Sequence, residues 1–183
     1  ALAGWSVDVH HAYDPVGRTL YLGNGDSRSA EGQNFDVIST LATGFSFPEG
    51  MAREAGGNLL VADSAAHVVR RVTPSGEKSV VAGTGVAGFS GDGGPAAQAQ
   101  LNHPSDVAVT ADGTVLIADE GNNRIRRLAT DGTIATIAGT GAGGYAGDGG
   151  PAIAAELDEP SDVATTADGS LYVIDRANHA LRR

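Results

Sequence analysis

The sequence predicts an all-β fold, a β-propeller of four-stranded antiparallel blades, and three observations support that prediction. Near-copies of one segment begin at Pro48, Pro104 and Pro160, so the displacement is 56 residues each time (104 − 48 and 160 − 104). Within each copy, short apolar runs alternate with glycine-containing turns. The 27 glycines also indicate many tight turns rather than long helices. A fixed period of this length is typical of propellers, solenoids and arrays, and short strands favour the propeller.

The second of these copies shows the expected order of the strands. Residues 107–109 form the first expected strand, and a turn at 111–113 follows. Residues 115–118 are apolar without interruption, as in an inner strand that is buried on both faces. Residues 124–128 alternate charged and apolar side chains, which suits a strand with one solvated face, and residues 133–138 supply a fourth strand.

A glycine-rich excursion lengthens the connection between blades and is itself repeated. Residues 82–96 return with few changes as residues 138–152. We expect one short helical turn in the alanine-rich stretch 96–101 that follows the first excursion. We also expect Phe89 and Tyr145 to anchor the two excursions by burial, since a long loop needs some buried side chains to stay ordered.

The whole chain, residues 1–183, is expected to form a single partial propeller. A degenerate copy at residues 17–23 precedes the three clear copies and lacks the excursion. The expected blades, about four in all, cover roughly residues 5–45, 46–102, 103–158 and 159–183, and the last blade is incomplete because it lacks its fourth strand. An open wedge of blades exposes strand edges and one apolar face. We therefore expect either a longer native polypeptide or copies of the chain that complete one another.

The composition excludes several classes of function. The net charge is −10, so a nucleic-acid partner is disfavoured because phosphate backbones are repelled. The chain has no cysteine, which rules out disulfides, thiol catalysis and zinc–thiolate sites but leaves the cellular compartment open. No apolar run approaches the length of a membrane span, so membrane insertion is not expected. No cofactor is expected either. Walker, Gly-x-Ser-x-Gly and His-Glu-x-x-His patterns, which mark nucleotide, serine-nucleophile and zinc sites, are missing from the sequence.

Acidic and basic residues recur at fixed places in the repeat. An aspartate ends each inner strand and an arginine follows seven residues later across the expected hairpin; these residues are Asp63, Asp119, Asp175, Arg70, Arg126 and Arg182. An aspartate that faces an arginine on an adjacent strand forms an ion pair or a hydrogen bond that holds the turn. Their presence in every full copy favours a structural role, because catalysis rarely needs one site per repeat.

The ends of the innermost strands are the places where a propeller brings side chains together. The alignment puts one set of equivalent residues at the mouth of the central channel: His10, Gly50, Asp106 and Asp162, with Glu49, Ser105 and Ser161 beside them. A histidine and several carboxylates around one cavity are what a metal or acid–base site needs. A channel that is merely polar and wet is the simpler interpretation. We therefore name these residues, glycine excepted, as candidates for binding and assign no catalytic residue.

Two features of the excursions resemble ligand sites but have a simpler explanation. Residues 83–88 and 139–144 match Gly-x-Gly-x-x-Gly, but no helix can start there to hold a pyrophosphate, so no dinucleotide site is expected. Asp92 and Asp148 are weak calcium candidates, because each excursion offers only one aspartate and capping a turn is the simpler role. A third set of equivalent residues is expected to form turns rather than a zinc site: His67, Asn123 and His179.

The repeated pattern resembles the NHL repeat. It reads Pro-Ser-Asp-Val-Ala, then Gly-Thr-Val-Leu-Ile-Ala-Asp, then Asn-Asn-Arg-Ile-Arg-Arg, and residues 178–181 read Asn-His-Ala-Leu. The excursion Ala-Gly-Thr-Gly…Gly-Asp-Gly-Gly-Pro-Ala is similar to that of the NHL propellers in bacterial RHS/YD-repeat proteins and in teneurins. The resemblance spans essentially the whole chain. It implies a non-catalytic scaffold module of a larger secreted or cell-surface bacterial protein, whose partners are other proteins or adjacent domains.

Two other functions stay open. A metal-dependent propeller lyase or hydrolase would use the channel residues, although the second and third full copies carry no histidine there. A self-assembling protein would close as a homo-oligomer, or polymerise, through its open blade edges. Divalent metal bound on the channel axis would favour the enzyme, and the mass in solution would reveal the assembly.

Overall fold

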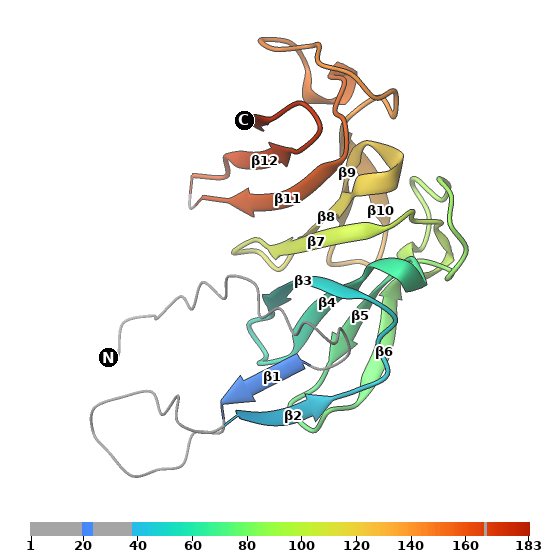
Figure 1. The fold of residues 1–183 in the computed structure, drawn as a ribbon, viewed down its shortest axis with the longest axis vertical. Coiled ribbons are helices and arrows are strands. Elements are labelled where there is room, and N and C mark those ends of the chain that lie inside the picture. The colour runs from blue at the N-terminus through green and yellow to red at the C-terminus, as the bar shows by residue number, and fades with distance from the viewer. Residues whose placement is uncertain (1–19, 24–37, 167) are drawn as a thin grey trace.

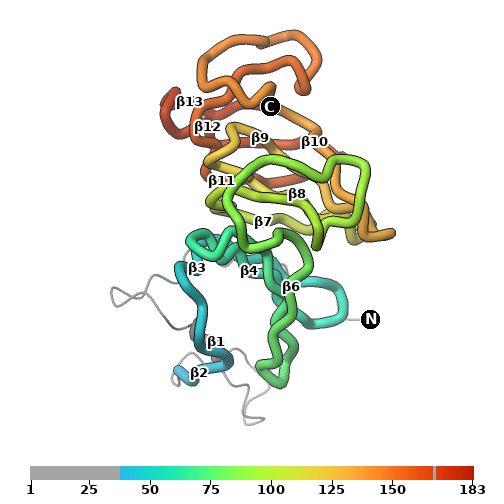
Figure 2. The backbone as a smooth tube through the Cα atoms, turned by 90° about the vertical axis from the view of Figure 1, so that its right-hand side faces the viewer, coloured from blue at the N-terminus to red at the C-terminus, as the bar shows by residue number. Residues whose placement is uncertain are grey.

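The computed structural model describes residues 20–23, 38–166 and 168–183. Within these ranges the chain is all β apart from four short 3-10 turns, η1 (Ser64–Ala66), η2 (Ala96–Gln98), η3 (Glu120–Asn122) and η4 (Ala152–Ala154). The described part forms four antiparallel sheets. Figures 1 and 2 show these sheets side by side in chain order, as the blades of a propeller. The predicted all-β propeller is therefore confirmed.

Two complete blades occupy the middle of the chain. Blade 2 contains β3 (Pro48–Arg53), β4 (Leu59–Asp63), β5 (Val68–Val72) and β6 (Lys78–Ala82), hydrogen-bonded in that order. Blade 3 contains β7 (Pro104–Val109), β8 (Val115–Asp119), β9 (Arg124–Leu128) and β10 (Ile134–Ala138) in the same order. Each of these sheets is therefore the four-stranded antiparallel unit that the repeat predicts.

The two ends of the described chain carry smaller sheets. Blade 4 contains β11 (Pro160–Thr165), β12 (Leu171–Asp175) and β13 (Ala180–Arg182). At the other end, β1 (Leu20–Gly23) pairs with β2 (Ile38–Ala42). The remaining strands expected for the first blade fall outside the described residues.

A β-bulge opens the innermost strand of each of blades 2, 3 and 4. The strand register shifts directly after Pro48, Pro104 and Pro160, each of which pairs with the aspartate that ends the next strand. A bulge leaves a residue out of the ladder and re-aims the side chains beside it. The channel candidates of the sequence, positions 49–50, 105–106 and 161–162, lie at these bulges. The repeat thus places the channel candidates of each blade at the same bulge.

Apolar side chains pack between blades 2 and 3. Strands β4 and β8 are buried along their whole length, as their uninterrupted apolar sequences predict. Ala62 and Val69 of blade 2 are fully buried, in one cluster with Leu101, Val107 and Ile117. Full burial of one aliphatic side chain of this size is worth about 1.5–3 kcal/mol, so this contact holds the two blades together.

The same contact recurs one period later between blades 3 and 4. Ala118 and Ile125, equivalent to Ala62 and Val69, are again fully buried. Their cluster contains Leu157, Val163 and Val173. Blades 2 and 3 are therefore each covered by the blade that follows.

The excursions fold onto the blade that follows them. The predicted helical turn is present as η2, and η4 is its counterpart. Asn122 Nδ2 donates to Gly88 O at 2.8 Å, and Asn178 Nδ2 donates to Gly144 O at 2.7 Å. Each excursion is therefore fastened to its blade by an asparagine at the same position of the repeat.

The prediction that Phe89 and Tyr145 anchor the excursions by burial is wrong. Phe89 is 41% exposed and Tyr145 is 61% exposed. Instead, the guanidinium groups of Arg124 and Arg182 lie over their rings, at 3.7 and 4.8 Å from the ring centroids. The excursions offer no apolar pocket for a ring, so contact between a cation and an aromatic face takes the place of burial.

Candidate functional site

The aspartate–arginine pairs of the repeat form buried ion pairs. Arg126 is fully buried and donates from Nη1 to Asp119 Oδ2 at 3.1 Å. Its Nη2 donates to Asp92 Oδ1 at 2.6 Å and to the carbonyl of Ser90 at 3.1 Å. Asp119 also accepts the backbone N–H of Asn102 at 2.8 Å. A buried charge that is paired and hydrogen-bonded in this way holds the strand, the turn and the excursion together.

The neighbouring blades carry ion pairs at the same places, although Arg70 donates from a different nitrogen. Arg70 Nε donates to Asp63 at 2.8 Å, and Arg182 Nη1 donates to Asp175 at 2.9 Å. Asp63 and Asp175 are fully buried, and each accepts backbone N–H groups from the entry of its own blade. Both carboxylates are buried and already hydrogen-bonded to protein groups, so a ligand cannot reach them.

The two aspartates considered as calcium ligands are occupied by arginines. Asp92 pairs with Arg126 and accepts the hydroxyl of Thr136 at 2.7 Å. Burial works against ionisation of Asp92, but the hydrogen bonds from Thr136 and Arg126 together lower its pKa. Asp148 pairs with Arg182 at 2.8 Å. The structure thus gives both aspartates an arginine partner.

Charged side chains from three blades meet beside the first residues of the innermost strands, where the sequence predicts the rim of the channel. Arg176 Nη2 donates to Glu120 Oε1 at 2.7 Å and to Glu159 Oε2 at 2.9 Å. Glu49 of blade 2 faces the same group. Burial, followed by the charge of Glu120, raises the pKa of Glu49 to about 7, although the residue as a whole stays exposed. Burial also raises the pKa of Glu120, and Arg176 offsets part of that shift. We call Glu49, Glu120, Glu159 and Arg176 the rim cluster.

Asp106 lies deeper, between the innermost strands of three blades. Its Oδ2 accepts the N–H of Val163 in blade 4 at 3.0 Å. On the other side it covers Gly50, where an added Cβ would lie 2.0 Å from Asp106 Oδ1, so that only glycine fits. Burial raises the pKa of Asp106 to about 7, and the charge of Asp162 adds to the shift. The carboxyl therefore ties blades together and titrates near neutral pH.

The other channel candidates are placed less favourably for binding. Ser105 is buried, and its hydroxyl donates to the carbonyl of Pro160 at 3.4 Å. Ser161 and Asp162 are half-buried on β11. His10 lies outside the described residues. The structure thus brings Asp106 and Asp162 together, and places Glu49 with the rim cluster.

Three rim residues were missed by sequence reasoning. Glu120 and Arg176 are equivalent residues, 56 positions apart, and the same place in blade 2 is Ser64. Glu159 corresponds to His103 in the same way. The available signal was disagreement between the copies, directly after the repeated aspartate for Glu120 and Arg176 and directly before the repeated proline for Glu159. Only the packing of adjacent blades shows that these differing residues meet.

A second contact between blades uses the turn residues. His67 and Asn123 both adopt left-handed backbone conformations, with φ of 55° and 52°. His67 Nδ1 accepts the N–H of His103 at 3.1 Å, and Asn123 Oδ1 accepts the N–H of Glu159 at 2.8 Å. The rings of His67 and His103 also meet edge to face at 4.5 Å. The turn residues therefore fasten one blade to the entry of the next, which goes beyond the predicted turn role.

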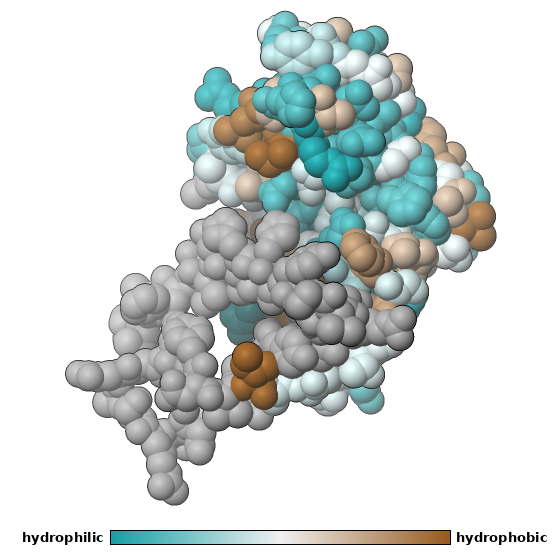
Figure 3. Space-filling model, viewed as in Figure 1, coloured by the Kyte–Doolittle hydropathy of each residue, from teal (hydrophilic) through white to brown (hydrophobic). Residues whose placement is uncertain are grey.

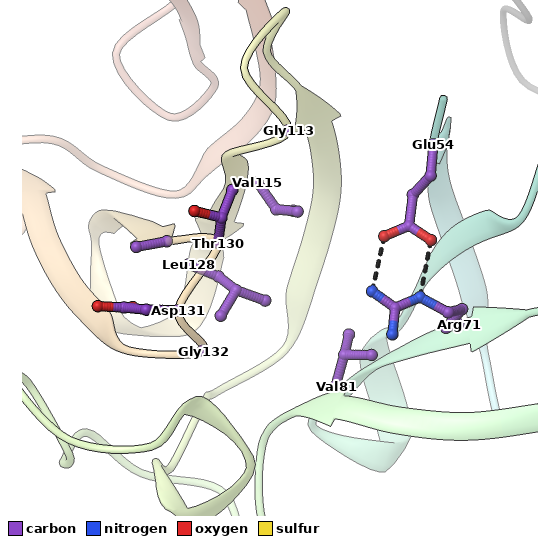
Figure 4. A pocket seen from close by; sticks show the side chains of 10 residues that line it. Glu54, Arg71, Val81, Gly113, Val115, Leu128, Thr130, Asp131 and Gly132 are labelled. Atoms are coloured by element: carbon purple, nitrogen blue, oxygen red, sulfur yellow. Dashed lines mark hydrogen bonds and ion pairs between the residues drawn. The ribbon is translucent and has the colours of Figure 1, made fainter. Parts of the chain in front are cut away.

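A groove of about 440 Å³ lies between blades 2 and 3, at the end of the strands away from the rim. Figure 4 shows Glu54 and Arg71 on one wall and Val115 and Leu128 on the other. Arg71 donates twice to Glu54, at 2.7 Å each time. Because this guanidinium already has its carboxylate, Arg71 is not free to orient an anionic ligand in the groove.

Comparison with known proteins agrees with the geometry of the blades. Residues 82–129 match the family model of the teneurin NHL domain. Human Teneurin-4 is 48% identical over 68 residues, which cover 32% of this chain and 2% of that protein. The described blades resemble those of NHL propellers. Protein SUPPRESSOR OF QUENCHING 1 of Arabidopsis thaliana is 29% identical over 176 residues, covering 89% of this chain and 16% of that protein.

Solved structures support the fold. A Bacteroides thetaiotaomicron protein of unknown function superimposes with a TM-score of 0.71 at 21% identity, covering 81% of this chain and 39% of the other. A virginiamycin B lyase from Staphylococcus aureus reaches a TM-score of 0.50 at 17% identity, covering 81% of this chain and 42% of the other. At such identities the likeness shows the propeller fold alone. The chain spans less than a fifth of the two relatives described above.

The described residues contain no group of three or more histidine, aspartate or glutamate side chains placed to hold a metal ion. Nor does any helix in the described ranges have the length and apolarity to cross a membrane. The rim cluster and the Asp106–Asp162 pair bring acidic side chains of different blades together beside the innermost strands.

Proposed function

We propose that this chain is a non-catalytic interaction module of a larger secreted or cell-surface protein, and that it binds a basic segment of a protein partner or adjacent domain at the rim cluster. One observation carries the proposal: the residues that differ between copies gather at the rim, whereas the aspartates and arginines shared by the copies are enclosed in the blades. The similarity to the teneurin NHL domain supports a role in protein contact.

The charge of the rim favours a basic partner. Glu49, Glu120 and Glu159 face a single arginine, Arg176, within the described rim, and the chain as a whole carries a net charge of −10. A cationic side chain that approached Glu49 would favour its ionised form and offset the repulsion from Glu120. Complementary charge also raises the rate of encounter, more strongly at low salt.

A peptide titration tests the proposal. Three peptides of equal length, one with alternating lysine and serine, one with serine alone and one with alternating glutamate and serine, are titrated into the chain at pH 7.5 and low salt. We expect binding of the lysine peptide alone. The double variant Glu49→Gln/Glu120→Gln should bind it at least about tenfold more weakly, a loss of about 1.4 kcal/mol.

A matched control separates the rim from net charge. The double variant Glu77→Gln/Asp112→Asn removes the same charge from exposed turns at the opposite ends of the strands. It should bind the lysine peptide as well as the unchanged chain does. Equal weakening in both double variants, or no binding of the lysine peptide, would contradict a binding site at the rim.

The same samples address the enzyme alternative. A propeller lyase or hydrolase would need a divalent cation at the channel, where Asp106 and Asp162 are the described carboxylates. Calorimetric titration with Ca²⁺, Mn²⁺ and Zn²⁺ is expected to show no saturable uptake. Uptake that is lost in Asp106→Asn would favour the enzyme over the scaffold.

A further inference from the structure

The contact between blades 2 and 3 includes a hydrogen bond that only a neutral histidine can make. His67 Nδ1 accepts the backbone N–H of His103 at 3.1 Å. A ring nitrogen that accepts a hydrogen bond has no proton of its own, so neutral His67 carries its proton on Nε2. A second proton must go to Nδ1, where it would face the N–H of His103. Protonation of His67 and closure of this contact therefore exclude each other.

The ring of His103, in contrast, tolerates a second proton. Its Nδ1 lies 2.9 Å from Asn102 Oδ1. The amide nitrogen of Asn102 donates to Gly121 O at 3.0 Å, so the amide oxygen is the atom that faces His103. An amide oxygen only accepts, so His103 Nδ1 donates from the neutral ring and from the charged ring alike. A charged His103 would repel a charged His67, because their ring centroids lie 4.5 Å apart.

The equivalent contact between blades 3 and 4 uses a group that does not titrate. Asn123 Oδ1 accepts the backbone N–H of Glu159 at 2.8 Å. The two acceptors, His67 and Asn123, have φ of 55° and 52°, and the two donors, His103 and Glu159, have φ of 47° and 52°. The two contacts thus share a left-handed backbone and differ in the chemistry of the acceptor. The chain therefore contains its own control for the effect of a proton.

Protons can reach the histidine contact, whereas the packing beneath it is apolar. His103 is exposed and His67 is half-buried. Beneath them, an apolar cluster that includes Val69, Leu101 and Ile117 joins the two blades. Figure 3 shows hydrophilic side chains gathered over the upper part of the molecule, where Figure 1 places blades 3 and 4. Loss of the histidine contact should therefore loosen the entry of blade 3 without separating the blades.

The charges around the pair favour a neutral His67 in the closed contact. Burial, followed by the charge of His103, lowers the pKa of His67. Burial raises the pKa of Glu120 in the rim cluster, and the nearby charge of His103 works against that shift. The buried aspartates directly before η1 and η3, Asp63 and Asp119, are paired with arginines. The contribution of the contact is therefore complete above the ordinary histidine pKa of 6.5 and is lost as the pH falls below it.

We propose that the contact of His67 with His103 is an acid-sensitive fastening, which releases the entry of blade 3 when His67 binds a proton and leaves the asparagine contact at blade 4 closed. The released stretch leads directly into β7. It includes Asn102, whose N–H donates to Asp119 at 2.8 Å. Acidic surroundings would thus loosen the chain beside Glu120 and the rim cluster, at one joint between blades.

Amide hydrogen exchange tests the proposal on the whole chain. Protection factors, which remove the intrinsic pH dependence of exchange, are compared at pH 7.5 and pH 5.0. We expect the protection factor of the His103 amide to fall at least about fivefold and that of the Glu159 amide to change less than about twofold. In isotopically labelled protein, the nitrogen–nitrogen coupling across the hydrogen bond to His67 Nδ1 should be present at pH 7.5 and lost at pH 5.0. A local measurement is needed because the raised pKa of Asp106 stabilises the whole chain in acid.

Exchanging the two acceptors supplies the controls. His67→Asn should protect the His103 amide equally at both pH values, and Asn123→His should make protection of the Glu159 amide acid-sensitive. His103→Asn keeps the backbone donor, so the loss of protection at position 103 in acid should remain. Equal losses at His103 and Glu159 in the unchanged chain would overturn the proposal. So would a loss that persists in His67→Asn, or one that disappears in His103→Asn.

Discussion

Arg124 lies with its guanidinium 3.7 Å from the ring centroid of Phe89, and so joins blade 3 to the excursion that precedes it. The same guanidinium donates to the carbonyl of Thr140, in the next excursion, at 2.6 Å. Gly141 has a φ of 92°, which favours glycine, and without a Cβ it leaves room for the guanidinium, because a Cβ there would lie 2.0 Å from Arg124 Nη1. Blades 2 and 4 carry Val68 and Ala180 at this place. Arg124 therefore links two excursions that the period alone treats as separate.

Loss of the Phe89 ring should loosen the first excursion. The N–H of Gly88 donates to Leu101 O at 3.1 Å and reports whether the excursion is closed. Phe89→Ala removes a contact between a cation and a ring worth about 0.5–1 kcal/mol at an exposed site. The Gly88 amide should then exchange about two- to fivefold faster. Val86→Ala, an exposed change in the same excursion, should leave that rate unchanged; equal effects would mean that Arg124 does not hold the loop.

Arg126 should be the arginine most costly to replace. Arg126→Met leaves Asp119 buried without its cation, and breaking a buried pair in this way typically costs about 3–5 kcal/mol. The neighbouring Arg127 is exposed, so Arg127→Met should change the free energy of unfolding by less than about 0.5 kcal/mol. Urea unfolding followed by far-ultraviolet circular dichroism measures both. Similar midpoints for the two variants would show that the buried pair is not a structural fastener.

The same substitution at two leucines tests the blade packing. Leu116 is 5% exposed in the cluster between blades 3 and 4, and Leu116→Asp should unfold the chain because it buries an unpaired carboxylate. Leu181 is 66% exposed, and Leu181→Asp should be tolerated. A soluble, cooperatively unfolding Leu116→Asp protein would mean that β8 does not lie between two blades.

The raised pKa of Asp106 should make stability fall as pH rises. The folded-state pKa of about 7 lies above the ordinary value of 3.8, so the folded chain binds a proton that the unfolded chain releases. The stabilising contribution is complete below pH 3.8 and is lost as pH rises through about 7, on the order of 1.4 kcal/mol for each unit of pKa difference.

Asp106→Asn isolates this contribution, because the amide can still accept the N–H of Val163. The variant should be more stable than the unchanged chain at pH 8 and should show a smaller fall between pH 4 and pH 8. Asp112→Asn, on an exposed turn, should leave the slope between pH 5 and pH 8 unaltered. Denaturant melts at four pH values measure this slope, and an unchanged slope in Asp106→Asn would exclude a raised pKa.

The period predicts the fold because each copy must bury the same residues against the next. The apolar run 115–118 identifies β8, and Asp119 with Arg126 identifies the buried pair, since both depend on neighbours close in sequence or across one hairpin. The contact of Glu120 with Arg176 could not be predicted from neighbours in the sequence or across one hairpin. It joins two copies whose residues differ, and only the angle between adjacent blades brings the two side chains together.

The ring of Phe89 illustrates a different limit. An aromatic residue in a long loop predicts burial, but the excursion is mostly glycine and alanine and cannot enclose a ring. Arg124 covers it instead. This arginine looks like one of a basic run in the sequence, and nothing in the period marks it, because the equivalent residues of the other blades are small or aliphatic.

Chemical-shift mapping of the lysine peptide on the isotopically labelled chain tests the central claim most directly. The account predicts that shifts concentrate at the backbone amides of Glu49, Glu120 and Arg176, and that the turns at Asp112 and Asp131 do not respond. Shifts centred on the groove of Glu54 and Arg71, or spread evenly over the acidic surface, would contradict a binding face at the rim.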